Sequence, residues 1–202
     1  MKKVIIIGTG GHAKVVFDGI LKTDDKVIGF MDELSDKHTF MGLPVYHSFS
    51  ELDKNCFYVV AIGNNKVRER FDAYNLNWYT FIHPTAVIAH DAIIKEGAMI
   101  LPGVIINASA VIGKHAIINS GAIIEHDCNI GDYVHVSPHA TICGTCNIGN
   151  KTWIGAGATI INNTNITSNV IIGAGSTVIK DVNKPGTYVG SPAHNIRGIV
   201  NE

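Results

Sequence analysis

The chain has 202 residues, 46% of them hydrophobic, and a mean hydropathy of +0.20, which excludes a disordered protein. Its length allows one large domain or two small ones. The formal net charge is -1 and the lysines and arginines are scattered, so neither a nucleic-acid footprint nor a polybasic membrane patch is indicated. We therefore expect small-molecule partners, no nucleic acid and no membrane.

The N-terminal segment MKKVIIIGTGGH contains an apolar run that glycines end too early for a signal peptide or a membrane span. We therefore expect a cytoplasmic protein. Four cysteines include one C-x-x-C, formed by Cys143 and Cys146, but no second pair completes a zinc site. No metal is expected.

Short buried-strand patterns alternate with helical patterns up to residue 80. The sequence predicts strands over 4–8, 27–32 and 57–63, and helices over 12–22 and 66–75. This alternation is typical of βαβ units, in which helices cover a parallel sheet.

From Ile82 onward the chain repeats with a period of six. Every sixth residue through position 178 is Ile, except for Val136 and Val178, which makes seventeen matches without a slip. The fifth residue of each hexad is small or Val, as in Ala122 and Cys128. Such hexads are typical of a parallel β-helix, in which three hexads close one triangular coil and the coils stack. The β-branched residue fills the interior and the small residue fits the corner.

Five segments carry a resemblance to a known family: GTGGHAK, VIGFMDE, AIGNNKVRER, EHDCNIGDYVHVSPHATICG and YVGSPAHNIRG. With the hexads, they make nearly the whole chain similar to the nucleotide-amino-sugar and sialic-acid acetyltransferases, and most of all to the UDP-4-amino-sugar N-acetyltransferases of the bacillosamine pathway. The resemblance implies a half-Rossmann-like, nucleotide-sugar-binding domain over 1–80. A left-handed β-helix over 81–183 and a C-terminal tail over 184–202 would follow. It also implies acetyl-CoA as co-substrate and a homotrimer.

Because three hexads make one coil, positions three hexads apart lie in register on adjacent coils, which places His126 directly over Gly144. A potential base therefore lies beside a residue without a side chain, which leaves room for a ligand and access to a backbone N–H. By resemblance, His126 is the general base, Asp127 orients it, and the Gly144 N–H stabilises the oxyanion. Because neighbouring strand residues point to opposite faces, His126 and Asp127 can meet only near a corner of the coil, or with help from Glu125 or another subunit.

The glycine-rich turn from Gly8 to Gly11 follows a predicted strand and opens a predicted helix, so its N–H groups suit a phosphate. The spacing of Asp32 from this turn would also fit an NAD-binding domain, but the region before the hexads supplies only half a dinucleotide fold, which suits a mononucleotide. The resemblance implies that the nucleotide sugar contacts Gly10, Gly11, His12, Asp32, Glu33 and Gly63. From the residues alone, Asp32 fits a solvated acid at a strand end equally well.

The resemblance further implies that acetyl-CoA lies along the β-helix between subunits, contacting His135, Gly144, Ala156 and Ala174. Three other functions stay open. An O-acetyltransferase acting on sialic acid or another sugar hydroxyl would use the same residues. A metal-dependent hydratase would need three histidines around Zn²⁺. A sugar-nucleotide-binding protein without catalytic activity would need no His126.

Overall fold

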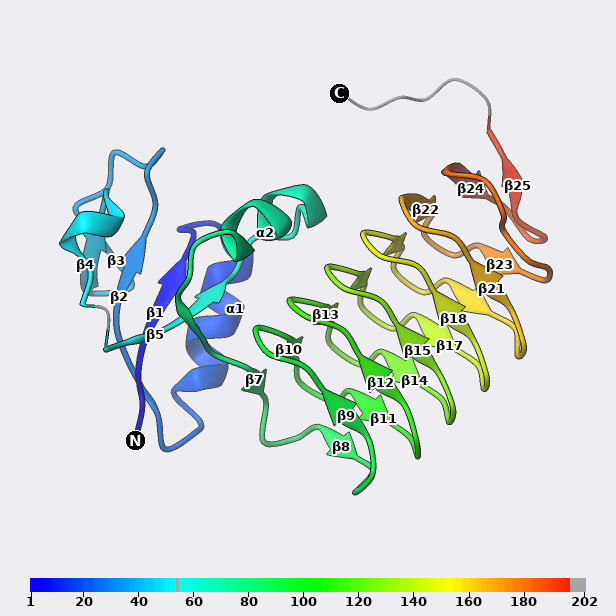
Figure 1. Cartoon of the computed structure of the whole chain (residues 1–202), viewed down its shortest axis with the longest axis horizontal. Coiled ribbons are helices and arrows are strands. Elements are labelled where there is room, and N and C mark those ends of the chain that lie inside the picture. Colours follow the sequence, from blue (N-terminus) through cyan, green and yellow to red (C-terminus); the bar gives the residue numbers. More distant parts are fainter. Residues whose placement is uncertain (54, 197–202) are drawn as a thin grey trace.

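The computed structural model describes residues 1–53 and 55–196 (Figure 1). An α/β N-terminal domain lies beside a column of stacked coils, which runs from green to red along the chain. Residues 197–202, which belong to the expected C-terminal tail and include the end of the YVGSPAHNIRG segment, lie outside the described residues.

The N-terminal domain is built on one sheet in the order β3-β4-β2-β1-β5-β6, parallel except for the β3–β4 hairpin. Both α-helices begin one residue earlier and end two or three residues earlier than predicted, and the third predicted strand ends at Val60, three residues earlier than predicted. The elements are β1 Lys3–Ile7, α1 Gly11–Ile20, β2 Lys26–Met31, β3 Thr39–Phe40, β4 Leu43–Tyr46, the 3₁₀ helix η1 Phe49–Glu51, β5 Phe57–Val60, α2 Asn65–Asp72 and β6 Asn77–Trp78.

Seventeen short strands, β7 to β23, form the β-helix and fall into three parallel sheets. The first sheet contains β7 Phe81–Ile82, β10 Met99–Ile100, β13 Ile117–Ile118, β16 His135–Val136, β19 Trp153–Ile154 and β22 Val170–Ile172. The second contains β8 Val87–Ile88, β11 Ile105–Ile106, β14 Ile123–Ile124, β17 Thr141–Ile142, β20 Thr159–Ile160 and β23 Thr177–Val178. The third contains β9 Ile93–Ile94, β12 Val111–Ile112, β15 Asn129–Ile130, β18 Asn147–Ile148 and β21 Asn165–Ile166.

Each strand from β7 to β20 pairs with the strand three hexads further along, as in Ile105 with Ile123 and Ile123 with Thr141. The β-branched residue of each hexad and the small residue before its strand point inward and form one continuous core. Cys128 and Cys146 lie in this buried small-residue column. Ile82 is 41% exposed because the first coil has no coil beneath it.

The chain closes the far end of the β-helix by adding two strands to the first sheet. β24 Gly186–Val189 pairs in parallel with β22, and β25 His194–Asn195 turns back antiparallel to β24. The carbonyls of Tyr188 and Gly190 accept hydrogen bonds from the N–H groups of Gly173 (2.8 Å) and Thr177 (3.0 Å) respectively. These backbone N–H groups at the end of the β-helix are thereby satisfied.

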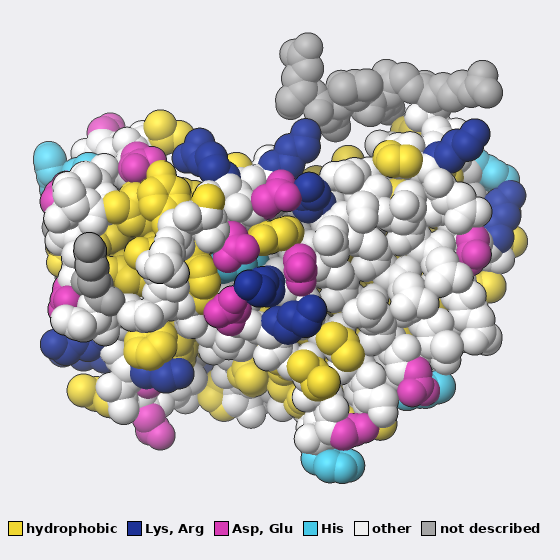
Figure 2. All heavy atoms as spheres, in the orientation of Figure 1, with side chains coloured by type: hydrophobic (Ala, Val, Ile, Leu, Met, Phe, Trp, Pro, Cys, Tyr) yellow, Lys and Arg dark blue, Asp and Glu magenta, His cyan; other side chains and the backbone are white. Residues whose placement is uncertain are grey.

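The N-terminal domain packs against the outer face of the first sheet of the β-helix. Met99, Leu101 and Ile117 from the coils belong to the same buried cluster as Val16 of α1 and Val4 of β1. Figure 2 shows acidic and basic side chains gathered on the surface between the two parts, whereas much of the β-helix face carries uncharged groups. The domain junction therefore contains an apolar cluster and carries charged groups at its rim.

Candidate active site

A pocket of about 620 Å³ opens at the carboxyl ends of β1 and β2, where parallel-sheet proteins commonly bind ligands. Five of the six residues expected to contact a nucleotide sugar line it, namely Gly10, Gly11, His12, Asp32 and Gly63. Glu33 is not among the lining residues; its carboxylate lies 4.0 Å from the Arg70 guanidinium.

Asp32 lines this nucleotide pocket but is already engaged by the protein. One carboxylate oxygen accepts hydrogen bonds from the Thr9 N–H (3.0 Å) and the Thr9 hydroxyl (2.7 Å), and the other accepts from the Leu34 N–H (3.1 Å). The side chain therefore ties the glycine-rich turn to the end of β2. This contact was not anticipated from the sequence, which offered only a ligand contact or a solvated acid.

His12 lies at the start of α1, and its ring centroid is 6.5 Å from that of His135 on β16. Burial, together with the nearby Arg68 cation, lowers the pKa of His12 to about 4 and that of His135 to about 3. Both imidazoles are therefore neutral near pH 7. Each has one buried nitrogen, Nε2 of His12 and Nδ1 of His135, for which the described residues 1–53 and 55–196 supply no hydrogen-bond partner.

His135 also lines a groove of about 520 Å³ on the β-helix, beside the nucleotide pocket. Ala156 and Ala174, which were expected to contact the cofactor, lie in the same groove. The exposed indole of Trp153 stacks on His135 with 5.9 Å between ring centroids, and its Nε1–H donates to the Ser137 hydroxyl (2.8 Å). Trp153 was not predicted as a site residue, although its place one full coil after His135 is a signal present in the sequence.

His126 and Asp127 lie in the turn between β14 and β15, in the part of the coil that we call the second corner. His126 Nδ1 is 2.7 Å from a carboxylate oxygen of Asp127. This direct contact is possible because Asp127 has a φ of +59°, in the left-handed region, which departs from the alternation of a strand. Glu125 makes a different contact, accepting a hydrogen bond from the Asn107 amide (2.9 Å).

Gly144 lies against the His126 ring, as the register of the coils predicts. A Cβ added at Gly144 would come within 2.7 Å of His126 Cε1 and Nε2. The Gly144 carbonyl accepts from the Asn163 N–H (2.9 Å), whereas within residues 1–53 and 55–196 its own N–H has no acceptor. His126 is more than half exposed, so Nε2 and this N–H face space that a ligand can enter.

The candidate residues occupy two different edges of the triangular coil. His126 and Gly144 are at the second corner, which follows the second sheet, whereas Ala156 and Ala174 are at the first corner, which follows the first sheet. The nucleotide pocket adjoins the groove at the first corner through His12 and His135. A single chain therefore does not bring His126 together with the groove.

No set of three or more His, Cys, Asp or Glu side chains is arranged to bind a metal ion in the described part of the chain. All four cysteines there are unpaired. None of the helices in the same residues is both long enough and apolar enough to cross a lipid bilayer.

Comparison with known proteins gives two matching family models, "PglD N-terminal domain" over residues 3–73 and "Bacterial transferase hexapeptide (six repeats)" over residues 109–144 and 145–180. A solved structure of a mutant perosamine N-acetyltransferase from Caulobacter crescentus, in complex with CoA and GDP-perosamine, is 31% identical, with a TM-score of 0.93 and 98% of each chain covered. The chain belongs to this family of sugar N-acetyltransferases.

Two further members of the sugar N-acetyltransferase family are similar to the chain. The acetyltransferase domain of PglB from Neisseria gonorrhoeae FA1090, in complex with acetyl coenzyme A, is 31% identical, with a TM-score of 0.88, 96% of this chain and 99% of that chain covered. UDP-N-acetylbacillosamine N-acetyltransferase from Bacillus subtilis (strain 168) is 38% identical over 112 residues, 50% of this chain. The match spans 52% of that curated relative's length.

These matches confirm the family predicted from the sequence. They also confirm the fold class, a half-Rossmann-like α/β domain followed by a left-handed β-helix of hexapeptide repeats. Family members bind CoA or acetyl-CoA as co-substrate, as two of these structures do.

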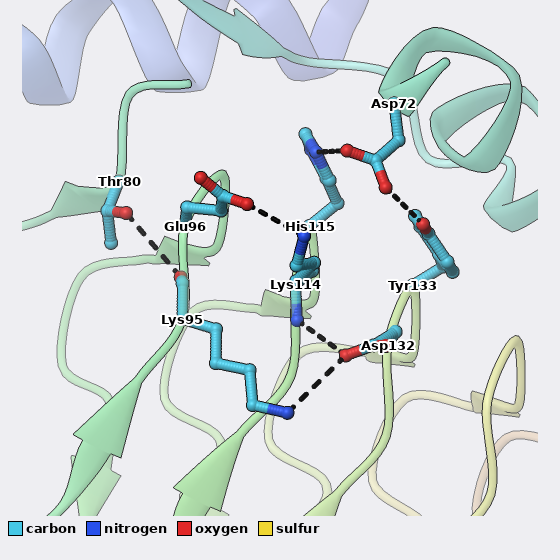
Figure 3. Close-up of polar contacts among 8 residues, drawn as sticks. All are labelled: Asp72, Thr80, Lys95, Glu96, Lys114, His115, Asp132 and Tyr133. Carbon is cyan, nitrogen blue, oxygen red and sulfur yellow. Dashed lines mark hydrogen bonds and ion pairs between the residues drawn. The ribbon is translucent and has the colours of Figure 1, made fainter. Parts of the chain in front are cut away.

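A polar network, which sequence analysis missed, joins the N-terminal domain to the β-helix (Figure 3). Asp72, at the end of α2, accepts a hydrogen bond from the Tyr133 hydroxyl (2.6 Å), and its other carboxylate oxygen lies 3.2 Å from His115 Nε2. Burial lowers the pKa of His115, although the Asp72 carboxylate opposes this effect. The Asp132 carboxylate accepts from the Lys114 N–H (2.8 Å) one coil below.

Proposed function

We propose that the chain transfers the acetyl group of acetyl-CoA to the 4-amino group of a nucleotide-linked amino sugar, with UDP as the nucleotide. The observation that carries this proposal is the contact between His126 Nδ1 and the Asp127 carboxylate (2.7 Å) beside Gly144. The carboxylate favours the tautomer with the proton on Nδ1, which leaves the lone pair on Nε2. His126 can therefore act as a base on the side where Gly144 leaves room.

In this mechanism the sugar amine attacks the thioester carbonyl while His126 Nε2 takes a proton from the nitrogen. The Gly144 N–H donates to the oxyanion of the tetrahedral intermediate, a contribution of about 3 kcal/mol. Collapse of the intermediate forms the amide, breaks the C–S bond and expels the CoA thiolate. The thiolate then receives the proton from His126, which yields free CoA.

The pocket at the N-terminus of α1 supports the proposal that this domain binds the nucleotide. The N–H groups of Gly10 and Gly11 open a ten-residue helix, and such an N-terminus favours phosphate. Neutral His12 lines the same pocket, and its buried Nε2 has no hydrogen-bond partner in the part of the chain that the structure describes. The choice of UDP rests on the similarity to the Bacillus subtilis enzyme, whose name specifies a UDP sugar. We assign Asp32 to holding the turn in shape, because its oxygens are occupied.

The groove on the first sheet supports binding of acetyl-CoA, with His135, Ala156 and Ala174 along its wall. Because His126 and Gly144 lie at another corner, we propose that the site is completed between subunits of a homotrimer, in which the second corner of one chain meets the groove of the next. Apolar side chains flank the second corner in the early coils, where they are available for such packing. They are Val87, Ile93, Ile105, Val111 and Ile123.

The four unpaired cysteines suit a reducing compartment, so we place the protein in the cytoplasm. Two solved structures of the Caulobacter crescentus enzyme carry replacements of one histidine, which supports the choice of a histidine as the catalytic group.

The test is thiol release from acetyl-CoA with a panel of UDP-, GDP- and CMP-linked amino sugars and the matching hydroxy sugars. Turnover with a UDP-4-amino sugar is expected. Turnover only with hydroxy sugars or sialic acid would replace the proposal with O-acetylation. Ligand binding without thiol release from any acceptor would indicate a binding protein without catalytic activity.

A further inference from the structure

Arg68, on α2, is fully buried at the junction between the N-terminal domain and the β-helix. Within residues 1–53 and 55–196, no carboxylate forms an ion pair with it. Burial lowers the pKa of Arg68 to about 9, so the group stays cationic near pH 7. A buried charge without a countercharge is costly unless hydrogen bonds satisfy it.

Six hydrogen bonds do so, and they divide equally between the two parts of the molecule. On the side of the N-terminal domain, Nη1 donates to the carbonyls of Ile62 (3.0 Å) and Gly63 (2.8 Å), and Nη2 donates to the Asn65 side chain (2.9 Å). On the side of the β-helix, Nε donates to the carbonyl of His115 (2.8 Å). Nη2 donates to the carbonyls of Tyr133 (2.6 Å) and Val134 (3.2 Å).

Four of these acceptors are backbone carbonyls in, or directly beside, the walls of the two ligand sites. Ile62 and Gly63 form a wall of the nucleotide pocket. Tyr133 and Val134 immediately precede His135, which lines the groove on the β-helix. One planar guanidinium, with five donors in a fixed arrangement, therefore bridges the two walls.

We propose that Arg68 is a positioning residue, which holds the Gly63 wall of the nucleotide pocket in register with the His135 wall of the groove so that the two substrates meet in reactive geometry. This inference rests on the proposed function. Arg68 touches neither pocket as a lining residue, so each ligand alone should bind normally without it. Only the joint reaction depends on alignment, and a displacement of about 1 Å can reduce a rate roughly 100-fold.

The test compares Arg68→Lys and Arg68→Gln with the wild type. We expect the dissociation constants of UDP and of CoA, measured separately, to change by less than about threefold, while kcat falls by about 100-fold. Arg68→Lys keeps the positive charge but lacks the planar guanidinium with its fixed donors. A clear loss of kcat in this variant therefore assigns the effect to geometry. Unchanged kcat in both variants would overturn the proposal, as would ligand affinities that fall as much as kcat or failure of both variants to fold.

Lys151→Gln is the matched control. Lys151 pairs with Glu69 (2.8 Å) across the same junction but lines neither wall. The kcat of Lys151→Gln should therefore equal that of the wild type. Crystal structures of wild type and Arg68→Lys separate this proposal from the proposed function. If the wild type acetylates no amino sugar, a shift of Gly63 relative to His135 by about 1 Å would still support positioning, and superimposable walls would refute it.

Discussion

The carboxylate of Asp127 lies 2.7 Å from the imidazole of His126, although the two residues are neighbours in the chain. In a strand they would point to opposite faces. At the second corner, the left-handed backbone of Asp127 turns its side chain back toward the preceding residue. The corner of the coil thus forms an acid–imidazole pair from adjacent residues, and the register places Gly144 beside it.

Replacing His126 with Ala should lower kcat by roughly 10² to 10⁴-fold, because the base that takes the amine proton is lost. The dissociation constant of CoA should stay within about threefold, since the residues that line the groove do not include His126. Thiol release and calorimetry measure both quantities. His90→Ala is the matched control, because His90 occupies the same column two coils earlier and is exposed. Equal activity in the two variants would remove His126 from the mechanism.

Asp127→Asn should lower kcat by at least about 10-fold with little change in stability. Asn tolerates the left-handed backbone, but its amide can no longer hold the imidazole in one tautomer as a carboxylate does. Asp127→Ala should in addition cost about 1 kcal/mol in the free energy of unfolding. The control is Asn163→Ala, at the equivalent position two coils later with a φ of +58°, which should share the loss of stability but keep full kcat. Kinetics combined with urea unfolding distinguish these results.

Gly144→Ala should lower kcat while leaving the melting temperature within a few degrees of the wild type. The added methyl would lie 2.7 Å from the His126 ring, so the imidazole must move. The backbone itself accepts Ala, since Gly144 is outside the left-handed region. A crystal structure of the variant should show a rotated His126. Wild-type kcat with a displaced ring would argue against the role of this pair.

The protein should lose stability as the pH falls from about 6.5 toward 4. The pKa of His12 is lowered to about 4 and that of His135 to about 3 in the folded state, both below the ordinary value of 6.5. The unfolded chain therefore binds more protons over this range, and the free energy of unfolding decreases with falling pH, by up to about 1.4 kcal/mol per pH unit for each histidine.

Chemical unfolding of the ligand-free protein at several pH values measures the slope of the free energy of unfolding against pH. His135→Gln should flatten it, because one of the two shifted groups is removed. His90→Gln, at an exposed site, is the matched control. Identical slopes in the wild type and both variants would contradict the assignment of the pH dependence to His12 and His135.

Ile105→Lys should dissociate the proposed homotrimer and abolish turnover, because it places a charge in the apolar strip beside the second corner. Thr159→Lys, in the same column of the second sheet but in the polar later coils, should leave mass and activity unchanged. Light scattering measures the mass of the assembly, and thiol release measures the activity. A full-mass, active Ile105→Lys variant would show that this strip does not form the interface.

Mixing subunits tests whether one site combines two chains. If His126 acts on the groove of a neighbour, co-refolding inactive His126→Ala with an inactive His135→Ala variant should restore part of the activity, since some mixed sites carry both intact histidines. No recovery in mixed trimers would mean that each chain forms its site alone.

The hexad period alone determined the β-helix, the register between coils, the inward columns and the position of His126 over Gly144. This succeeded because a coil repeats one local backbone conformation, so spacing in the sequence equals position in space. The βαβ pattern likewise predicted the parallel sheet and the glycine-rich turn, although it placed both helix ends too far along the chain.

Tertiary structure alone decided how the domains meet. Docking on the first sheet brought His12 to His135 and buried Arg68 among six acceptors, and packing within the N-terminal domain engaged Asp32 with Thr9. It also separated the His126 corner from the groove that His135 and Trp153 line. These contacts join residues far apart in the chain through side-chain packing and desolvation, for which no local period or motif is a guide.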